Sequence, residues 1–294
     1  MTPKVVRPRG VQPPKLRTLL ATLLLVVAPI AALATFVLLR DPVPAPLASL
    51  GTADAHALAI DPQDADRIFF GHHGGLLESR DGGRTWTETT LSGADAMNVS
   101  TGADGVLQVA GHELYVTSSD GGATWQPVEN DLPGLDLHSF VVDPADPEHA
   151  WTFAAGLGLF ETTDGGARWE LRQQGNWGAL TVYRTADRTV LVAIGPEGLA
   201  GSSDAGATWS ALAYPGAPLS GGLAAAGDGS AIYAATISGL RRSDDGGASW
   251  RSTGWNGPAL AVAVAPTNAS VVALVDDAMN VYRSADGAAS WPAP

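Results

Sequence analysis

The sequence contains no cysteine, and its only lysines lie within the first 15 residues. Without cysteine there are no disulfides, thiolate zinc sites, cysteine nucleophiles or lipid-modified cysteines. Residues 1–40 contain six of the 17 Lys and Arg residues and no acidic residue. The rest of the chain contains the other 11 basic residues and all 30 acidic residues, so its formal charge is −19. So acidic a surface repels phosphate groups, which excludes nucleic acid as a partner.

A strongly apolar run of 22 uncharged residues lies between Arg17 and Arg40. About 20 apolar residues span a bilayer as a helix. Basic residues precede this run and acidic residues dominate after it, so the positive-inside rule places the N-terminus in the cytoplasm. The sequence therefore predicts a basic cytoplasmic tail (1–17), a transmembrane signal anchor (18–39), a Pro-rich spacer (40–46) and an extracytoplasmic domain (47–294).

The alternative is a signal peptide cleaved after Ala32-Leu33-Ala34, which would release the domain. Signal-peptide apolar regions usually span about 7–15 residues. Here the apolar sequence continues through Thr35–Leu39, beyond the cleavage motif. An uncleaved anchor is therefore favoured, and both interpretations place the domain outside the cytoplasm.

One eight-residue string, first seen as Ser79–Trp86, occurs six times, with successive tryptophans 39 to 44 residues apart. A repeat of this period indicates a solenoid, propeller or array. The Asp and Trp of the six copies are Asp81 and Trp86, Asp120 and Trp125, Asp164 and Trp169, Asp204 and Trp209, Asp245 and Trp250, and Asp286 and Trp291.

Each repeat contains the same elements in the same order. In the first, an apolar run (His56–Ile60) ends at Asp61-Pro62, a second β-rich run (Arg67–Gly71) follows, a short third run enters the string, and a fourth begins at its Trp. Four short strands per unit are typical of a propeller blade, whereas a helical repeat would need apolar residues three and four apart. The predicted fold is all-β: a six-bladed propeller of four-stranded antiparallel blades, preceded by one transmembrane helix.

The string itself favours a self-bonded turn, because Asp and Ser or Thr accept nearby backbone N–H bonds and Gly adopts positive φ. The pattern S-x-D-x-G-x-T-W resembles the Asp-box, or BNR, repeat of sialidases, xyloglucan-cleaving glycosidases, sortilin-type domains and photosystem II assembly factors. The stretch His56–Trp86 looks most like the last three groups. The string departs from the pattern at Arg168, Ser249, Ala288 and Ser290. The resemblance implies that the boxes are structural clips between third and fourth strands, on the face away from the binding site.

Two structural expectations follow from the ends of the repeat array. Only Pro-Ala-Pro follows Trp291, so the last blade lacks an outer strand, and residues about 46–50 are predicted to pair with Asn280–Ser284. Trp125, in an intact string, is expected to contribute more stability than Trp291, whose string has Ala288 in place of glycine.

The opposite face is formed by turns between second and third strands and by connections between blades, and loops on a rigid scaffold commonly carry function. The connections contribute Asp54, Asp95 and Asp136 among other residues. The hairpins of blades six, one and two are expected to form the functional centre. The candidate ligand-binding residues are His56, His72, His73, His112, Glu113, His138, Trp177, Glu197, Trp255, Asp276 and Asp277.

These residues predict a membrane-anchored extracytoplasmic module that binds a protein, glycan or small ligand without catalysis. The alternative is a glycoside hydrolase using Glu113, Glu197, Asp276 or Asp277 as acid and base. Sialidase activity is rejected, because no arginine falls in a binding-face loop to clamp a carboxylate and the F/Y-R-I-P motif is missing. A monomeric ectodomain without a cofactor is expected, with a divalent metal on the histidines left open.

Overall fold

A computed structural model describes residues 44–102, 104–217 and 219–292. The predicted cytoplasmic tail, the transmembrane anchor and residues 40–43 of the spacer lie outside these residues. Within the described part of the chain, there is no helix of the length and apolar character needed to cross a membrane.

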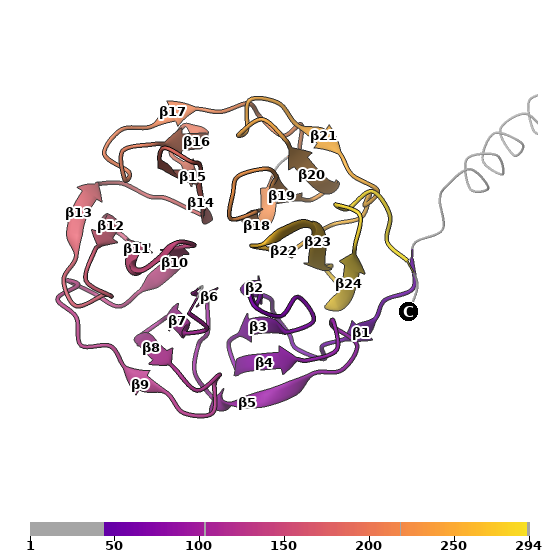
Figure 1. Ribbon diagram of the computed structural model, residues 1–294, viewed down its shortest axis with the longest axis horizontal. Helices are drawn as coiled ribbons and strands as arrows, with labels where there is room; N and C mark the ends of the chain where they lie inside the picture. Colours follow the sequence, from indigo (N-terminus) through magenta and orange to yellow (C-terminus); the bar gives the residue numbers. More distant parts are fainter. Residues whose placement is uncertain (1–43, 103, 218, 293–294) are drawn as a thin grey trace, which may run out of the picture. The chain divides into compact units, whose positions relative to one another are not determined.

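The described residues form six four-stranded antiparallel sheets arranged as blades in a ring (Figure 1). Blades one to three contain β2 (Ala57–Ile60), β3 (Ile68–His72), β4 (Gly75–Ser79) and β5 (Thr87–Ser92); β6 (Asn98–Thr101), β7 (Leu107–Gly111), β8 (Leu114–Ser118) and β9 (Gln126–Pro127); and β10 (Leu137–Asp143), β11 (Asp146–Ala154), β12 (Gly158–Thr162) and β13 (Glu170–Gln173).

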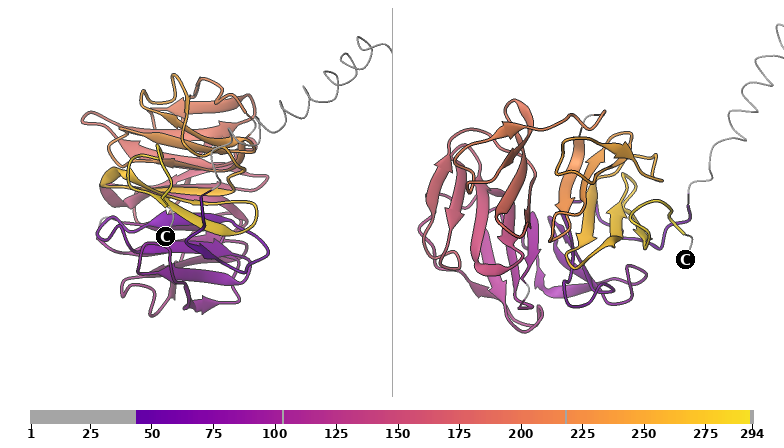
Figure 2. Two further views of the ribbon diagram at one scale, coloured as in Figure 1. Left: turned by 90° about the vertical axis from the view of Figure 1, so that its right-hand side faces the viewer. Right: turned by 45° about the horizontal axis from the view of Figure 1, so that its top comes forward.

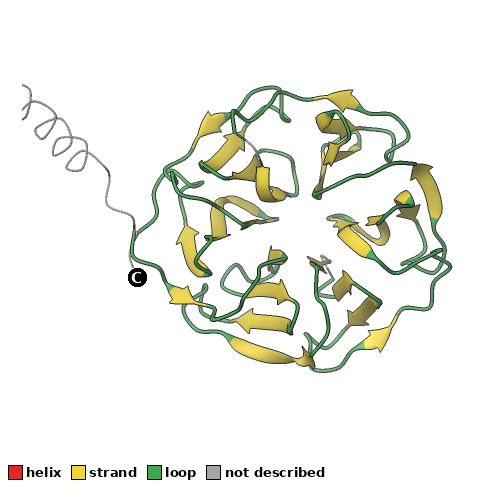
Figure 3. Ribbon diagram, turned by 180° about the vertical axis from the view of Figure 1, so that it is seen from behind, coloured by secondary structure: helices red, strands yellow, loops and turns green. Residues whose placement is uncertain are grey.

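Blades four to six complete the ring. They contain β14 (Leu180–Arg184), β15 (Thr189–Gly195), β16 (Gly198–Ser202) and β17 (Ser210–Ala211); β18 (Leu219–Ala225), β19 (Ile232–Thr236), β20 (Gly239–Ser243) and β21 (Arg251–Ser252); and β22 (Ala261–Ala265), β23 (Asn268–Val275), β24 (Asn280–Ser284) and β1 (Ala48–Ser49). Strands and loops make up all of the described ring (Figure 3). The predicted all-β, six-bladed fold is confirmed.

The ring is closed by a strand from the other end of the domain. Ala48 pairs with Val281 and Ser49 with Asn280, so β1 becomes the outer strand of blade six. The Leu47 and Leu50 N–H groups donate to the Val281 and Met279 carbonyls at 2.8 and 2.9 Å. The predicted pairing of residues 46–50 with the last strand is confirmed, and it covers an edge of β24 that would otherwise be open.

The first strand of each blade lies nearest the ring axis (Figure 1). The loops gather at the two faces of the ring (Figure 2). These inner strands are rich in small residues such as Ala57, Ala59, Ala261 and Ala263, and they line an axial channel of about 410 Å³. Larger side chains, including Phe69, Leu76 and Val109, are buried between blades. The blade interfaces therefore form the core and the axis stays open.

The six repeated strings form turns that follow the third strand of each blade, with the same hydrogen bonds; in blades one to five the turn leads into the fourth strand. In the first turn, Ser79 Oγ donates to Asp81 Oδ1 at 2.9 Å, and the Gly83 N–H donates to Ser79 Oγ at 2.9 Å. Asp81 Oδ1 also accepts the Thr85 N–H at 2.9 Å. The Ser or Thr to Asp bond recurs in all five other turns. The self-bonded turn predicted from residue chemistry is therefore present.

The expected ranking of two tryptophans conflicts with their burial. Trp291 is buried, with 7% of its surface exposed, whereas Trp125 is only partly buried. The reason is local: Gly254 of the preceding connection donates its N–H to the Ala288 carbonyl, which brings Trp255 against Trp291. An intact string does not by itself bury its tryptophan.

The turn aspartates should make the protein acid-sensitive in a defined window. Hydrogen bonds, chiefly from the side-chain hydroxyl of the last Thr or Ser, lower the pKa values of Asp81, Asp120, Asp204 and Asp286 from 3.8 to about 2. Because these values are lower in the folded state, the bonds stabilise the protein above pH 4 and are lost as the pH falls from about 4 to 2. Thermal melts should be nearly flat from pH 7 to 5 and fall steeply below 4, and less steeply for Asp81→Asn combined with Asp120→Asn. A wild-type melting temperature that stays constant down to pH 2 would refute this.

Candidate functional site

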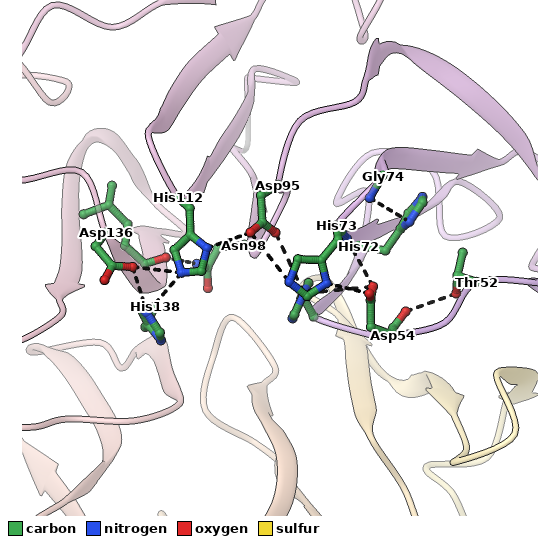
Figure 4. Close-up of polar contacts among 12 residues, drawn as sticks. Thr52, Asp54, His72, His73, Gly74, Asp95, Asn98, His112, Asp136 and His138 are labelled. Atoms are coloured by element: carbon green, nitrogen blue, oxygen red, sulfur yellow. Dashed lines mark hydrogen bonds and ion pairs between the residues drawn. The ribbon is translucent and has the colours of Figure 1, made fainter.

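Four histidines and three aspartates lie close together (Figure 4), and two of them, His56 and His138, line the axial channel. They come from three consecutive blades: the connection before β2, the β3–β4 hairpin, the β5–β6 connection, the β7–β8 hairpin and the start of β10. We call this set the mouth cluster; it consists of Asp54, His56, His73, Asp95, His112, Asp136 and His138.

The first half of the mouth cluster joins Asp54, His56 and His73. His73 Nδ1 lies 2.5 Å from Asp54 Oδ2 and 3.0 Å from His56 Nε2. The His73 N–H donates to Asp54 Oδ1 at 3.1 Å, and His56 Nε2 lies 4.0 Å from the same oxygen. One ring nitrogen of each histidine and the carboxylate therefore converge.

The second half joins His112, Asp136 and His138. Nε2 of His112 and Nε2 of His138 lie 3.3 Å apart, and both face Asp136 Oδ1, at 2.9 and 2.8 Å. Between 41% and 56% of each of these side chains is exposed. These three atoms converge as those of the first half do.

Asp95 lies between the two halves. Its Oδ2 is 2.7 Å from His112 Nδ1 and 3.8 Å from His73 Nε2, and its Oδ1 is 3.8 Å from His56 Nε2. Oδ1 is buried and has no hydrogen-bond partner. A buried carboxylate oxygen without a hydrogen-bond partner costs free energy of folding, so a cation or a hydrogen-bond donor at this position would stabilise the protein.

Backbone contacts fix the loops of the cluster. His112 and Asp136 form an isolated β-bridge, which holds the second half together. Gly111 and Gly71 lie so close to the Asp95 connection that added Cβ atoms would stand 1.8 Å from the Asp95 carbonyl oxygen and 2.2 Å from that of Ala96. Only glycine permits this approach. These contacts hold the Asp95 connection against the β3 and β7 strand ends and keep His112 beside Asp136.

The first half is electrostatically polarised. The pKa of His73 is raised, first by its side-chain hydrogen bond to Asp54 and further by the negative charge of Asp95. Burial and the neighbouring His73 lower the pKa of His56. Burial would raise the pKa of Asp54, but the hydrogen bonds from His73 outweigh it and lower that pKa. A proton is thus held between Asp54 and His73, while His56 favours its neutral form.

Of the residues predicted from the sequence, the structure brings His56, His73, His112 and His138 together. His72 belongs to the same hairpin as His73, but its Nδ1 accepts the Gly74 N–H at 3.1 Å and its ring stacks on Phe70. Glu113, exposed at the β7–β8 turn with a φ of 53°, follows His112 and makes none of the contacts that define the cluster.

The carboxylates of blade six serve another purpose. Asp276 Oδ1 accepts the N–H groups of Ala278 and Asn280, and its Oδ2 accepts the Asn280 amide and the Tyr282 hydroxyl. Asp276 is buried and organises its own hairpin, while Asp277 is exposed. The cluster is therefore built by blades one, two and three, and not by the expected blades six, one and two.

The remaining predicted residues lie in other blades. Trp177 and Trp255 are buried, packing against Trp209 and Trp291 respectively. Glu197 is exposed and lines a separate groove of about 630 Å³ in blade four, together with Trp177. The two tryptophans therefore contribute to packing, and Glu197 belongs to the blade-four groove.

Sequence reasoning placed Asp54, Asp95 and Asp136 on this face but left them out of the candidate set. Each lies in an inter-blade connection, and two of them stand two residues before a cluster histidine, as Asp54-Ala-His56 and Asp136-Leu-His138. That recurring D-x-H spacing at equivalent strand starts was the available signal.

Comparison with known proteins identifies the fold. No protein-family model matches the chain, and no curated protein sequence matches it significantly. Similar solved structures include a GH74 xyloglucanase from Xanthomonas campestris (23% identity, TM-score 0.51, 77% of this chain and 36% of that one) and a GH74 enzyme from Niastella koreensis (18%, 0.53, 81% and 46%). The chain therefore spans less than half the length of either enzyme.

Two further structures match over most of both chains. YCF48 bound to a D1 peptide is 20% identical, with a TM-score of 0.50, over 85% of this chain and 82% of that one. A chain of a nidogen/laminin complex is 11% identical, with a TM-score of 0.61, over 78% and 93%. At these identities the likeness shows the fold alone: this chain is a six-bladed β-propeller, similar both to enzymes and to proteins solved with protein or peptide partners.

Proposed function

We propose that this protein is a membrane-anchored propeller that presents its mouth face outside the cytoplasm and binds a protein partner there without catalysing a reaction. The observation that carries the proposal is the convergence of seven polar side chains from three blades at the channel mouth. The hydrogen bonds of the six repeated turns support its assignment to the Asp-box repeat proteins, in which those turns are structural.

Exposed apolar side chains on the same face support a protein partner. Leu157 and Ile237 lie in the second-to-third strand hairpins of blades three and five, and Tyr214 lies in the connection before β18. Their exposed fractions are 39%, 54% and 65%. Protein interfaces combine apolar and aromatic contacts with polar groups that fix the orientation of the partner.

The glycosidase alternative has less support. Both oxygens of Asp276 are used by its own hairpin, and Glu197 lies in blade four, away from the mouth cluster. A glycosidase needs two carboxyl groups facing one bond, about 5–9.5 Å apart. We expect the purified full chain to leave xyloglucan and other β-glucans intact.

Single cysteines test the proposal cleanly because the natural chain has none. Leu157→Cys marks the mouth face, Asp187→Cys marks the β14–β15 turn on the opposite face, and Thr2→Cys marks the N-terminus. Intact cells expressing each full-length variant would be treated with a membrane-impermeant maleimide that carries a photo-crosslinker. Cysteines 157 and 187 should be labelled and cysteine 2 should not.

On illumination, the label at position 157 should give one protease-sensitive adduct that is absent for position 187. Adducts of equal yield from both positions would contradict a binding face at the mouth. Labelling of cysteine 2 in intact cells would contradict the membrane orientation. An adduct that resists protease would contradict a protein partner and indicate a glycan ligand instead.

A further inference from the structure

We infer that the mouth cluster is a two-ion metal site, with one divalent transition metal of the zinc class at Asp54, His56 and His73 and a second at His112, Asp136 and His138. The inference rests on the proposed role of this face as the functional centre, but not on the identity of the partner. Among the described residues, these are the two groups whose ligand atoms converge closely enough for a metal ion.

The second group has nearly the geometry of ligands around one ion. Its three atoms, Nε2 of His112, Nε2 of His138 and Oδ1 of Asp136, are separated by 3.3, 2.9 and 2.8 Å. Tetrahedral zinc bonded to nitrogen and oxygen at about 2.0–2.2 Å keeps its ligands about 3.3 Å apart. A small outward movement of the carboxylate would admit the ion, and the exposed side would leave a fourth position for water or a partner's side chain.

The two carboxylates beside His112 fit a metal ion bound at one of its ring nitrogens. Both of its ring nitrogens face carboxylates, Nδ1 that of Asp95 at 2.7 Å and Nε2 that of Asp136 at 2.9 Å. With a metal on Nε2, a neutral His112 donates its remaining N–H to Asp95, the carboxylate–histidine–metal arrangement that orients metal-binding histidines.

The first group needs a slightly larger adjustment. His73 Nδ1 is 3.0 Å from His56 Nε2 and 2.5 Å from Asp54 Oδ2. Replacing the shared proton with an ion would separate these atoms by several tenths of an ångström, within the freedom of one hairpin turn. The backbone N–H of His73 already holds the other oxygen of Asp54.

Asp95 lies between the two groups and adds a negative charge to the site. Its buried Oδ1 lacks a hydrogen-bond partner and lies 3.8 Å from His56 Nε2. The oxygen is not one of the converging ligand atoms of the first group, so Asp95 acts as a neighbouring negative charge that favours a cation and not as a ligand. Its other oxygen pairs with His112 Nδ1 at 2.7 Å, which links Asp95 to a ligand of the second ion.

Charge and ligand type select the ion. Three carboxylates in one cluster repel each other, and two divalent ions offset that repulsion. Two imidazoles in each group favour zinc, copper or nickel, whereas calcium and magnesium prefer sites made wholly of oxygen. The absence of thiolates removes the competing soft ligands.

The test is metal stoichiometry in the purified full-length protein, held in detergent after chelation with EDTA. Zinc, calcium and magnesium would each be titrated by calorimetry, and zinc retained after desalting would be counted by mass spectrometry. The variants are His73→Ala, His138→Ala, their combination and Asp95→Asn. The matched controls are His72→Ala, adjacent to His73, and His149→Ala, a histidine paired with Glu161 outside the cluster.

The wild-type protein and both controls should bind two zinc ions, His73→Ala and His138→Ala one each, and the double variant none, with no calcium or magnesium binding. Asp95→Asn should weaken zinc binding about 10- to 100-fold, as the loss of an orienting carboxylate does. The apo forms of all variants should melt within a few degrees of one another, which separates loss of ligands from misfolding. No zinc bound by the wild type, or two ions retained by the double variant, would overturn the inference. Either result would leave the crosslinking test of the mouth face intact.

Discussion

Replacing Trp291 with alanine should lower the free energy of unfolding by about 3–5 kcal/mol, the cost of deleting a buried aromatic side chain. Trp291 is 7% exposed and belongs to a buried cluster with Tyr282 and Trp255, whose ring centroid lies 5.6 Å from its own. Its Nε1 makes no hydrogen bond, so the loss is one of packing. Urea denaturation followed by fluorescence would measure it.

Trp125→Ala is the matched control, because it removes the same side chain from an equivalent turn where it is only partly buried. Its cost should be clearly smaller than that of Trp291→Ala. Equal losses, or a larger loss at Trp125, would show that the turn sequence and not burial decides how much these tryptophans stabilise the blades.

Breaking the closing strand should have the second large effect. Leu47→Pro together with Leu50→Pro removes the two N–H groups that bond to Val281 and Met279, and also shortens two half-buried leucines. At about 0.5–1.5 kcal/mol for each hydrogen bond, plus lost packing, the free energy of unfolding should fall by about 2–4 kcal/mol. For a domain of this size, that is roughly 4–16 °C in melting temperature.

The control is Ala45→Pro, at an exposed position before β1. It introduces the same residue into the same segment without touching the strand ladder, so its melt should match that of the wild type. The double variant should also aggregate on heating, since β24 would gain an unpaired edge. A double variant as stable as Ala45→Pro would mean that β1 does not hold the ring closed.

The fold could be predicted from the sequence because every blade contains the same turn residues at the same spacing. Asp and Gly in each turn, followed by Trp, mark the third-to-fourth strand boundary six times, and the missing outer strand after Trp291 indicates where the ring must close. Burial was not readable in the same way. The depth of Trp291 depends on Gly254 and Trp255 of a neighbouring connection, a contact that no repeat pattern encodes.

The candidate site could be predicted only in part. Four of its histidines follow from their place in the hairpins and strand starts of one face, but the direction of each side chain depends on local turn geometry. His72 and His73 are adjacent, yet one bonds within its own hairpin and the other faces Asp54. Asp276 looks equally free in the sequence, but its own hairpin uses both oxygens.

The most direct test of the mouth cluster as the functional centre is an anomalous difference map at the zinc edge, from crystals of the protein grown with zinc. The map should show one peak bonded to His112, Asp136 and His138 and a second bonded to His56, His73 and Asp54. A map with no peak at either group, or with zinc bound only by the aspartates of the repeated turns on the opposite face, would contradict the account.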